Sequence, residues 1–263
     1  MATQLLMYKS AVPISRTRHA GGYVEMGADY AFSGEVNCVP LMTVEFPLAA
    51  REFAIVFAGQ SGEILPAVIL GVRDKQNLFV SSGRTWGARY VPAFVRRYPF
   101  IFTRSEDRLM LCIDEEYPGF NREGRGQPLF ADEGKPSPYL DQVMQFLQQY
   151  QREFTRTRVF CNRLDEMGLL EPMVAQVPVT QGEQVSMGGF LVVSRAKLKA
   201  LPADKLAELA KTDQLELVFL HLQSMRNFDL LQERMHGAPE TMPDADGSAP
   251  VAQEPAPAAD AVQ

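Results

Sequence analysis

The stretch YPFIFTRSEDRLMLCID, Tyr98–Asp114, contains two apolar runs with a short polar segment between them. Both runs are rich in aromatic and large aliphatic residues, which are typical of strands, and the intervening SED at 105–107 is typical of a turn. Strands this close in sequence pair as an antiparallel hairpin, because a parallel crossover needs a dozen or more residues. The stretch therefore predicts a hairpin.

Three further apolar runs precede this hairpin, at Ala54–Ala58, Ala67–Val72 and Asn77–Val80. Polar segments of the kind found in turns separate them, GQSG at 59–62 and RDKQ at 73–76. The spacing again leaves no room for crossover helices. The N-terminal half is thus predicted to form an antiparallel sheet from hairpin-connected strands.

The C-terminal half is predicted to begin with a long helix. Ser137 is a preferred N-cap residue, and Pro138 is favoured at the first helical position. Apolar residues then recur at helical spacing between Leu140 and Phe154. The helix is expected to end at Met167, because Gly168 is a typical C-terminal stop.

A strand insert and two more helices complete the expected fold. Val174–Val179 and Phe190–Val193 have the composition of strands, and Leu198–Lys211 and Leu215–Met235 have that of helices. Strands gathered in one half and helices in the other are typical of the α+β class. We therefore predict an α+β fold: an antiparallel sheet, then helices with a strand insert.

A change of composition divides the chain near residue 235. From His236 to Gln263 alanine, proline and acidic residues dominate, with five acids and no Lys or Arg. Such a segment buries too little apolar area to offset its ordering entropy, so 236–263 is predicted to be a disordered acidic tail. Residues 1–235 are predicted to form a single globular domain. Without the tail the net charge of −6 becomes −1, which argues against a nucleic-acid partner.

The three cysteines, Cys38, Cys112 and Cys161, are far apart and lie among apolar neighbours. This pattern predicts free thiols in a reducing compartment rather than a disulfide framework or a zinc site. The N-terminus lacks the apolar core of a secretory signal, and no stretch is apolar over the roughly 18 residues of a membrane span. We therefore expect a cytoplasmic protein without a membrane span.

The common catalytic and cofactor-binding motifs are missing. The sequence has no GxGxxG after a strand, no Walker phosphate loop, no HExxH and no GxSxG. Histidine is scarce, and no spacing of ligand residues predicts a metal site. We expect neither a cofactor nor a bound metal.

Three residues are candidates for acid–base chemistry: His19, Asp114 and His221. Asp114 opens an acidic triplet at a strand end, where neighbouring charges raise a carboxyl pKa. His221 shares a helical face with Ser224, as a base and a nucleophile would. His19 follows the cationic stretch 16–18 and is a candidate anion or metal anchor. For each residue the alternative is a structural role, with Asp114 paired to arginines and the two histidines fixing local structure.

The most distinctive stretch is SGRTWGARYVPAFVRRYP, Ser82–Pro99, which contains the only tryptophan. The wider segment Arg73–Arg108 has eight Lys or Arg against three acids. Arginines among aromatic rings suit carboxylates and other anionic groups. The predicted ligand-binding residues are Arg84, Trp86, Arg89, Tyr90, Arg96 and Arg97. In the structural alternative the arginines pair with Asp114–Glu116 and the rings fill the core.

Short motifs follow one another in a fixed order through the whole predicted domain. They are Arg16-Thr17-Arg18-His19, Val39-Pro40, Glu45-Phe46-Pro47, Ala54-Ile55-Val56-Phe57, Leu70-Gly71, Asn77-Leu78-Phe79, Trp86, Tyr90-Val91-Pro92, Arg96-Arg97-Tyr98-Pro99-Phe100, Cys112-Ile113-Asp114, Phe146-Leu147, Gly189-Phe190, Leu201-Pro202 and His221-Leu222-Gln223-Ser224. In this order they resemble the bacterial SapC family, from about Tyr8 to Met235. The resemblance implies an association with a surface-layer system or with uptake receptors. It implies no established reaction and no catalytic residues.

Residues and resemblance together predict a non-enzymatic, cytoplasmic binding or accessory protein of a surface-layer or uptake system. Its partner would be a protein or peptide, or a small anionic ligand, bound by the Trp86–Tyr98 segment. The alternative is an uncharacterised enzyme that uses His19, Asp114 or His221 in acid–base chemistry. That alternative requires these groups to meet in one concave pocket.

Overall fold

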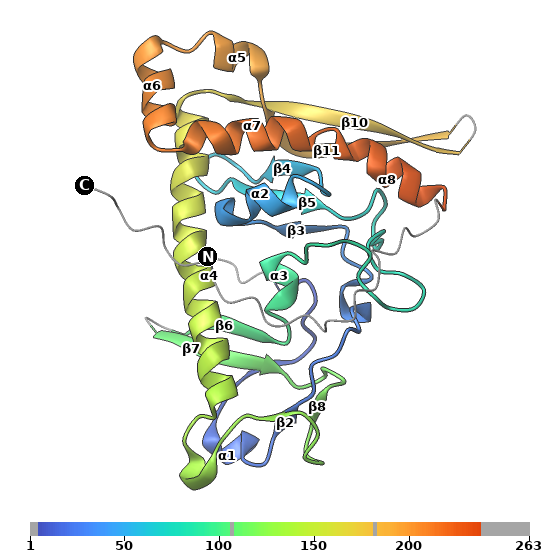
Figure 1. Ribbon diagram of the computed structural model, residues 1–263, viewed down its shortest axis with the longest axis vertical. Helices are drawn as coiled ribbons and strands as arrows, with labels where there is room; N and C mark the ends of the chain where they lie inside the picture. Colours follow the sequence, from blue (N-terminus) through green and yellow to red (C-terminus); the bar gives the residue numbers. More distant parts are fainter. Residues whose placement is uncertain (1–4, 106–107, 181–182, 238–263) are drawn as a thin grey trace.

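The computed structural model describes residues 5–105, 108–180 and 183–237 (Figure 1). Over these residues strands dominate the first half of the chain, and helices with one long hairpin form the second half. Every strand pair is antiparallel, so the predicted α+β class is confirmed. Of the predicted disordered tail, residues 238–263 lie outside the described part of the chain.

The five-stranded sheet joins the two halves of the chain, with the order β10-β11-β4-β5-β3. Its strands are β3 Cys38–Pro40, β4 Ile55–Ala58, β5 Leu65–Ile69, β10 Leu170–Thr180 and β11 Glu183–Val193. The hairpin β10–β11 is the predicted strand insert. It connects to β4 through one residue pair, Leu191 with Phe57. The insert therefore extends the N-terminal sheet. The pairing of β11 with β4 joins residues far apart in the sequence, so no local sequence pattern predicts it.

Two smaller sheets lie beside the large one, with the orders β1-β7-β6 and β8-β2-β9. Their strands are β1 Ala11–Pro13, β2 Tyr23–Val24, β6 Phe100–Ser105, β7 Arg108–Asp114, β8 Phe120–Asn121 and β9 Gln127–Pro128. The pair β6–β7 is the predicted hairpin at Tyr98–Asp114. The N-terminal strands thus form several sheets, because the long segment between β5 and β6 is irregular and does not make a hairpin turn.

The predicted strand at Asn77–Val80 is wrong. The side-chain oxygen of Asn77 accepts a hydrogen bond from the backbone N–H of Phe79 at 2.9 Å, which turns the chain locally. Val80 makes only an isolated bridge, with Trp86. The apolar composition of this run predicts a strand, but the side chain of Asn77 fixes a turn there.

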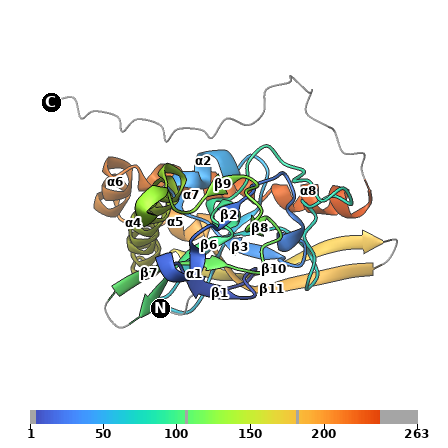
Figure 2. The same ribbon diagram turned by 90° about the horizontal axis from the view of Figure 1, so that it is seen from below.

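The helix α4, Pro138–Glu166, runs along much of the long axis of the molecule (Figures 1 and 2). The Ser137 hydroxyl accepts a hydrogen bond from the backbone N–H of Leu140 at 3.1 Å, so the predicted cap is confirmed. The helix ends before Gly168, whose φ of +64° favours glycine. Its first half packs on the β1-β7-β6 sheet and its second half on the main core.

The remaining helices are short. They are α1 Arg16–His19, α2 Phe46–Ala49, α3 Ala93–Arg96, α5 Arg195–Lys199, α6 Ala203–Lys211, α7 Gln214–Ser224 and α8 Asn227–Met235, with 3-10 turns at Ala31–Ser33, Thr43–Glu45 and Asp132–Gly134. The two long helices predicted after the strand insert are wrong, since each is two helices. Pro202 precedes α6 and has no N–H to continue α5. Among the described residues, no helix has the length and apolarity needed to traverse a lipid bilayer.

The three cysteines are free, with Cys112 and Cys161 buried and Cys38 half-buried. Burial raises the pKa of Cys38 and raises that of Cys161 to about 12. Both thiols are therefore protonated, and poorly reactive, at neutral pH.

We expect titration with a thiol reagent to find three free thiols in the denatured protein. In the native protein Cys161 should react slowly, because its thiol is buried and protonated. Fewer than three thiols after denaturation without reductant would mean that a disulfide forms.

Candidate functional site

His221 lies between the ends of two neighbouring strands, β4 and β11. Its Nδ1 is 2.8 Å from the carbonyl oxygen of Ile55, and its Nε2 accepts a hydrogen bond from the backbone N–H of Val193 at 3.0 Å. A carbonyl only accepts, so Nδ1 carries the proton and the imidazole is neutral. Extending the register from Leu191–Phe57 would place Val193 opposite Ile55. The histidine therefore replaces one step of the ladder where the strands separate.

Ser224 completes this junction from the next turn of α7. Its hydroxyl accepts a hydrogen bond from the backbone N–H of Ile55 at 3.0 Å and donates one to the carbonyl of His221 at 2.6 Å. His221 and Ser224 are both fully buried. Burial lowers the pKa of His221 to about 4. Both side chains are thus occupied by backbone groups, and they join α7 to β4 and β11.

Asp114 is a buried carboxylate at the end of β7. Its two oxygens accept hydrogen bonds from the backbone N–H groups of Lys9 at 2.9 Å, Ser10 at 3.0 Å and Glu116 at 3.1 Å. The Tyr98 hydroxyl donates a fourth at 3.2 Å. This carboxylate fixes the N-terminal segment and the turn after β7, as expected of a buried charge that is satisfied by many donors.

His19 faces the neighbouring acid, Glu115. Its Nδ1 accepts from the backbone N–H of Ser15 at 3.2 Å, and its Nε2 lies 3.3 Å from Glu115 Oε1. The Arg18 guanidinium binds the same carboxylate, with Nε 2.7 Å from Oε1, and lowers the pKa of Glu115. Burial lowers the pKa of His19. His19 thus lies against Glu115, the residue that follows β7, without a hydrogen bond from Nε2 to that carboxylate.

The three acid–base candidates do not form one constellation. His19 reaches the residue next to Asp114, but the two side chains have different partners. His221 lies on α7 and is bonded to backbone groups of β4 and β11 in the five-stranded sheet. Within residues 5–105, 108–180 and 183–237, no group of three or more His, Cys, Asp or Glu side chains is arranged to hold a metal.

Two glutamates fix the backbone of Ser82–Pro99, here called the arginine–aromatic segment. Glu52 accepts hydrogen bonds from the backbone N–H groups of Arg89 at 2.9 Å and Tyr90 at 3.0 Å. Glu45 is buried, and its Oε1 accepts from the Tyr90 hydroxyl and from the backbone N–H of Ala93, both at 2.7 Å. Burial raises the pKa of the Glu45 carboxyl above its usual value. The segment is therefore held in one conformation at its centre.

The aromatic residues of the segment are partly built into the core. The Trp86 ring packs against Tyr30, Phe53 and Phe79, with ring centroids 5.6–6.3 Å apart, and its Nε1–H donates to the carbonyl of Tyr90 at 2.9 Å. Trp86 is half-buried in this position. One edge of the indole thus stabilises the fold, and only the remainder of its surface is accessible to a partner.

The four arginines of the segment have different surroundings. Arg97 is buried, and its guanidinium lies over the Phe94 ring at 3.9 Å. Arg84 is exposed and pairs with Asp29, rather than with the acidic triplet Asp114–Glu116. The guanidinium of Arg96 is exposed and stacks on the rings of Tyr90 and Phe146.

Arg89 is exposed as well, and its guanidinium makes no hydrogen bond or ion pair with the described residues. Arg84, Arg89 and Arg96 thus place charge at the surface, while Arg97 belongs to the interior. The predicted binding residues divide between a surface set and a buried set.

Sequence reasoning missed Asp29, Glu45 and Glu52, which position this segment. Glu45 accepts a hydrogen bond from the Met42 N–H at 2.8 Å and Asp29 accepts one from the Ala31 N–H at 2.9 Å, but neither local contact indicates the arginine–aromatic segment. The contacts of Glu52 and Asp29 with that segment span 37 or more positions. Spacing along the chain could not reveal them.

Comparison with known proteins places this fold in one family. A search of the curated proteins and a search of the solved structures gave no match. The model of the SapC family matches residues 14–231, from the α1 segment to α8 and including both the histidine junction and the arginine–aromatic segment. This match covers most of the chain, and the protein therefore belongs to the SapC family.

Proposed function

We propose that this chain is a non-enzymatic binding or accessory protein of a bacterial surface-layer or uptake system, and that it works in the cytoplasm. Its partner is an acidic peptide segment, which the exposed arginines Arg84, Arg89 and Arg96 bind beside Trp86. The observation that carries the proposal is Arg89, an exposed guanidinium on a fixed backbone that makes no ion pair with the acids of the described residues. The surface-layer or uptake setting is proposed from what the resemblance to the SapC family implies.

The surroundings of the other arginines support the same chemistry. Arg84 pairs with Asp29 at the surface, where an ion pair contributes little, so an incoming carboxylate can exchange with it at small cost. Glu52 fixes the backbone at Arg89, which lowers the entropy lost on binding. Arginine on a rigid base also binds carboxylates in bidentate fashion.

Two of the three acid–base candidates, His221 and Asp114, support a binding role over catalysis. The nitrogens of His221 and the oxygens of Asp114 are occupied by backbone donors and acceptors. A catalytic base needs access to the proton it removes. Neither group offers that access in this arrangement.

We expect labelled peptides rich in Asp and Glu to bind in fluorescence anisotropy, and the Arg89→Glu variant to bind them at least about tenfold more weakly, since a charge-assisted hydrogen bond contributes about 1.5–3 kcal/mol. Arg195→Glu is the matched control, because Arg195 is also exposed but begins the distant helix α5. Trp86 fluorescence should shift on binding. Equal affinity of both variants, or no binding of any acidic peptide, would rule the proposal out.

A further inference from the structure

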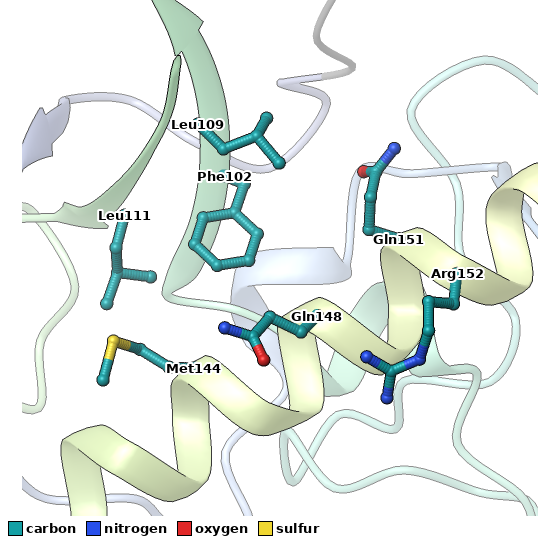
Figure 3. Close-up of a pocket in the computed structure, with 7 residues that line it drawn as sticks. All are labelled: Phe102, Leu109, Leu111, Met144, Gln148, Gln151 and Arg152. Atoms are coloured by element: carbon teal, nitrogen blue, oxygen red, sulfur yellow. The ribbon is translucent and has the colours of Figure 1, made fainter.

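A groove lies between the β6–β7 hairpin and α4. It has a volume of about 460 Å³, within the size range of small-molecule sites. Its lining includes Phe102, Leu109, Leu111, Met144, Gln148 and Arg152. Figure 3 shows the three hairpin side chains facing the helix, with Met144 near Leu111 and Gln148 near Phe102. Figures 1 and 2 both place the hairpin beside α4.

The apolar wall of this groove follows from the register of the hairpin. Phe102 pairs with Leu111 and Arg104 pairs with Leu109, so these four residues share one face. At the base of the hairpin, around Phe100 and Ile113, α4 covers this face and the residues form a hydrophobic core. Towards the hairpin tip the helix no longer covers it, and Leu109 is left 49% exposed. Leu109 is thus presented to the groove, and Phe102 and Leu111 are half-buried between the groove and the core.

The other wall changes from apolar to cationic along α4. Met144 lines one end and Arg152 the other, eight residues and therefore about 12 Å further along the helix. Among the described residues Arg152 bonds only the neutral amide oxygen of Gln149, whereas Arg156, one turn on, pairs with Glu153. In the described part of the chain no acid lines the groove, and Arg104 lies opposite Leu109 in the hairpin, on the same face.

We propose that this groove binds a fatty acid. The hydrocarbon chain lies against Phe102, Leu109, Leu111 and Met144, and the carboxylate lies on the guanidinium of Arg152. An apolar wall with a cation at one end is complementary to an anion with a hydrocarbon tail.

The site goes beyond the acidic-peptide surface and is separate from it. Arg96 stacks on Phe146, and residues two apart on a helix, such as Phe146 and Gln148, do not share a face. The two proposals therefore succeed or fail on different residues.

The test is isothermal titration calorimetry of the full chain with decanoate, at concentrations below its micelle threshold, and with decanol as the uncharged analogue. Decanoate is expected to bind with one-to-one stoichiometry, and decanol about tenfold more weakly, because it lacks the charge-assisted bonds to Arg152. Arg152→Gln should weaken decanoate binding about tenfold and leave decanol binding unchanged. Arg195→Gln, an exposed arginine on α5, is the matched control and should bind like the native chain.

Leu109→Asn tests the apolar wall and should weaken both ligands. Native affinity in Arg152→Gln, equal binding of decanoate and decanol, or no binding of either ligand would overturn the proposal.

Two other possible occupants of the groove are tested with the same variants. A dimer in sedimentation that Leu109→Asn dissociates would assign the groove to a second copy of the chain. Binding to anionic vesicles without binding to monomeric decanoate would assign it to a membrane surface. Either result would overturn the fatty-acid site.

Discussion

Replacement of His221 by alanine is expected to lower the free energy of unfolding by about 3–5 kcal/mol at pH 7. The imidazole satisfies the N–H of Val193 and the carbonyl of Ile55 in a fully buried position. Each of these backbone groups would lose its partner, at a cost of about 1–3 kcal/mol, and the missing ring would leave a cavity. Urea denaturation followed by circular dichroism measures the change.

His236→Ala is the matched control, because His236 is exposed at the end of α8. Its loss should change the free energy of unfolding by no more than about 0.5 kcal/mol. A loss below about 1 kcal/mol in His221→Ala would contradict the bridging role, since an unpaired buried N–H and carbonyl together cost more than that.

The stability that His221 supplies should also depend on pH. Its pKa is about 4 in the folded protein, against an ordinary value of 6.5. Between these values the unfolded chain binds a proton on this imidazole and the folded protein does not, so stability falls as the pH falls through this window. The difference in pKa corresponds to about 3 kcal/mol.

The stability gap between native protein and His221→Ala should therefore narrow by up to about 3 kcal/mol from pH 7 to pH 4. His19 is present in both proteins, so its own titration cancels from the comparison. A gap that stays constant over this range would show that folding does not lower the pKa of His221.

The features that the sequence predicts correctly are those that local interactions determine. Ser137 caps α4 through a residue three positions away, and Gly168 ends the helix through its own φ. The β6–β7 hairpin also needs only its turn and two adjacent runs. Each signal lies within one element, so a single sequence without relatives is sufficient to read it.

The features that escape prediction depend on residues far apart in the chain. His221 bonds Ile55 across 166 positions, and Leu191 pairs with Phe57 to attach the C-terminal hairpin. A His and a Ser on one helical face predict a base and a nucleophile as readily as a structural junction. Only the positions of β4 and β11 distinguish the two interpretations, and those positions are a property of the whole fold.

The arginine–aromatic segment illustrates the same limit within the candidate site. Its composition indicates a binding surface, yet Trp86 and Arg97 are packed inward while Arg84, Arg89 and Arg96 are exposed. Composition cannot separate the two sets, because each contains aromatic-flanked cations. The separation is made by acids outside the segment, and the most deeply buried of these is Glu45.

Replacement of Glu45 by alanine is accordingly expected to cost about 3–5 kcal/mol of unfolding free energy, or roughly 10 °C in Tm. Its carboxyl accepts hydrogen bonds from the Met42 and Ala93 N–H groups and from the Tyr90 hydroxyl, and all three donors would be left without this acceptor. Trp86 donates to the carbonyl of Tyr90, so its fluorescence should move towards that of a solvent-exposed indole.

Two other glutamates serve as comparisons for the loss of stability in Glu45→Ala. Glu35→Ala should change little, because Glu35 is exposed, and Glu52→Ala should cost about 1–3 kcal/mol, because Glu52 is half-buried and holds two backbone N–H groups. Acidic-peptide binding should weaken in Glu45→Ala although every surface arginine is retained. The backbone that carries Arg89 would no longer be held in one conformation, so more entropy would be lost on binding. A Glu45→Ala protein as stable as Glu35→Ala would contradict the buried anchor. Native peptide affinity in a destabilised Glu45→Ala would show that the arginines bind without the preorganisation that Glu45 and Glu52 provide.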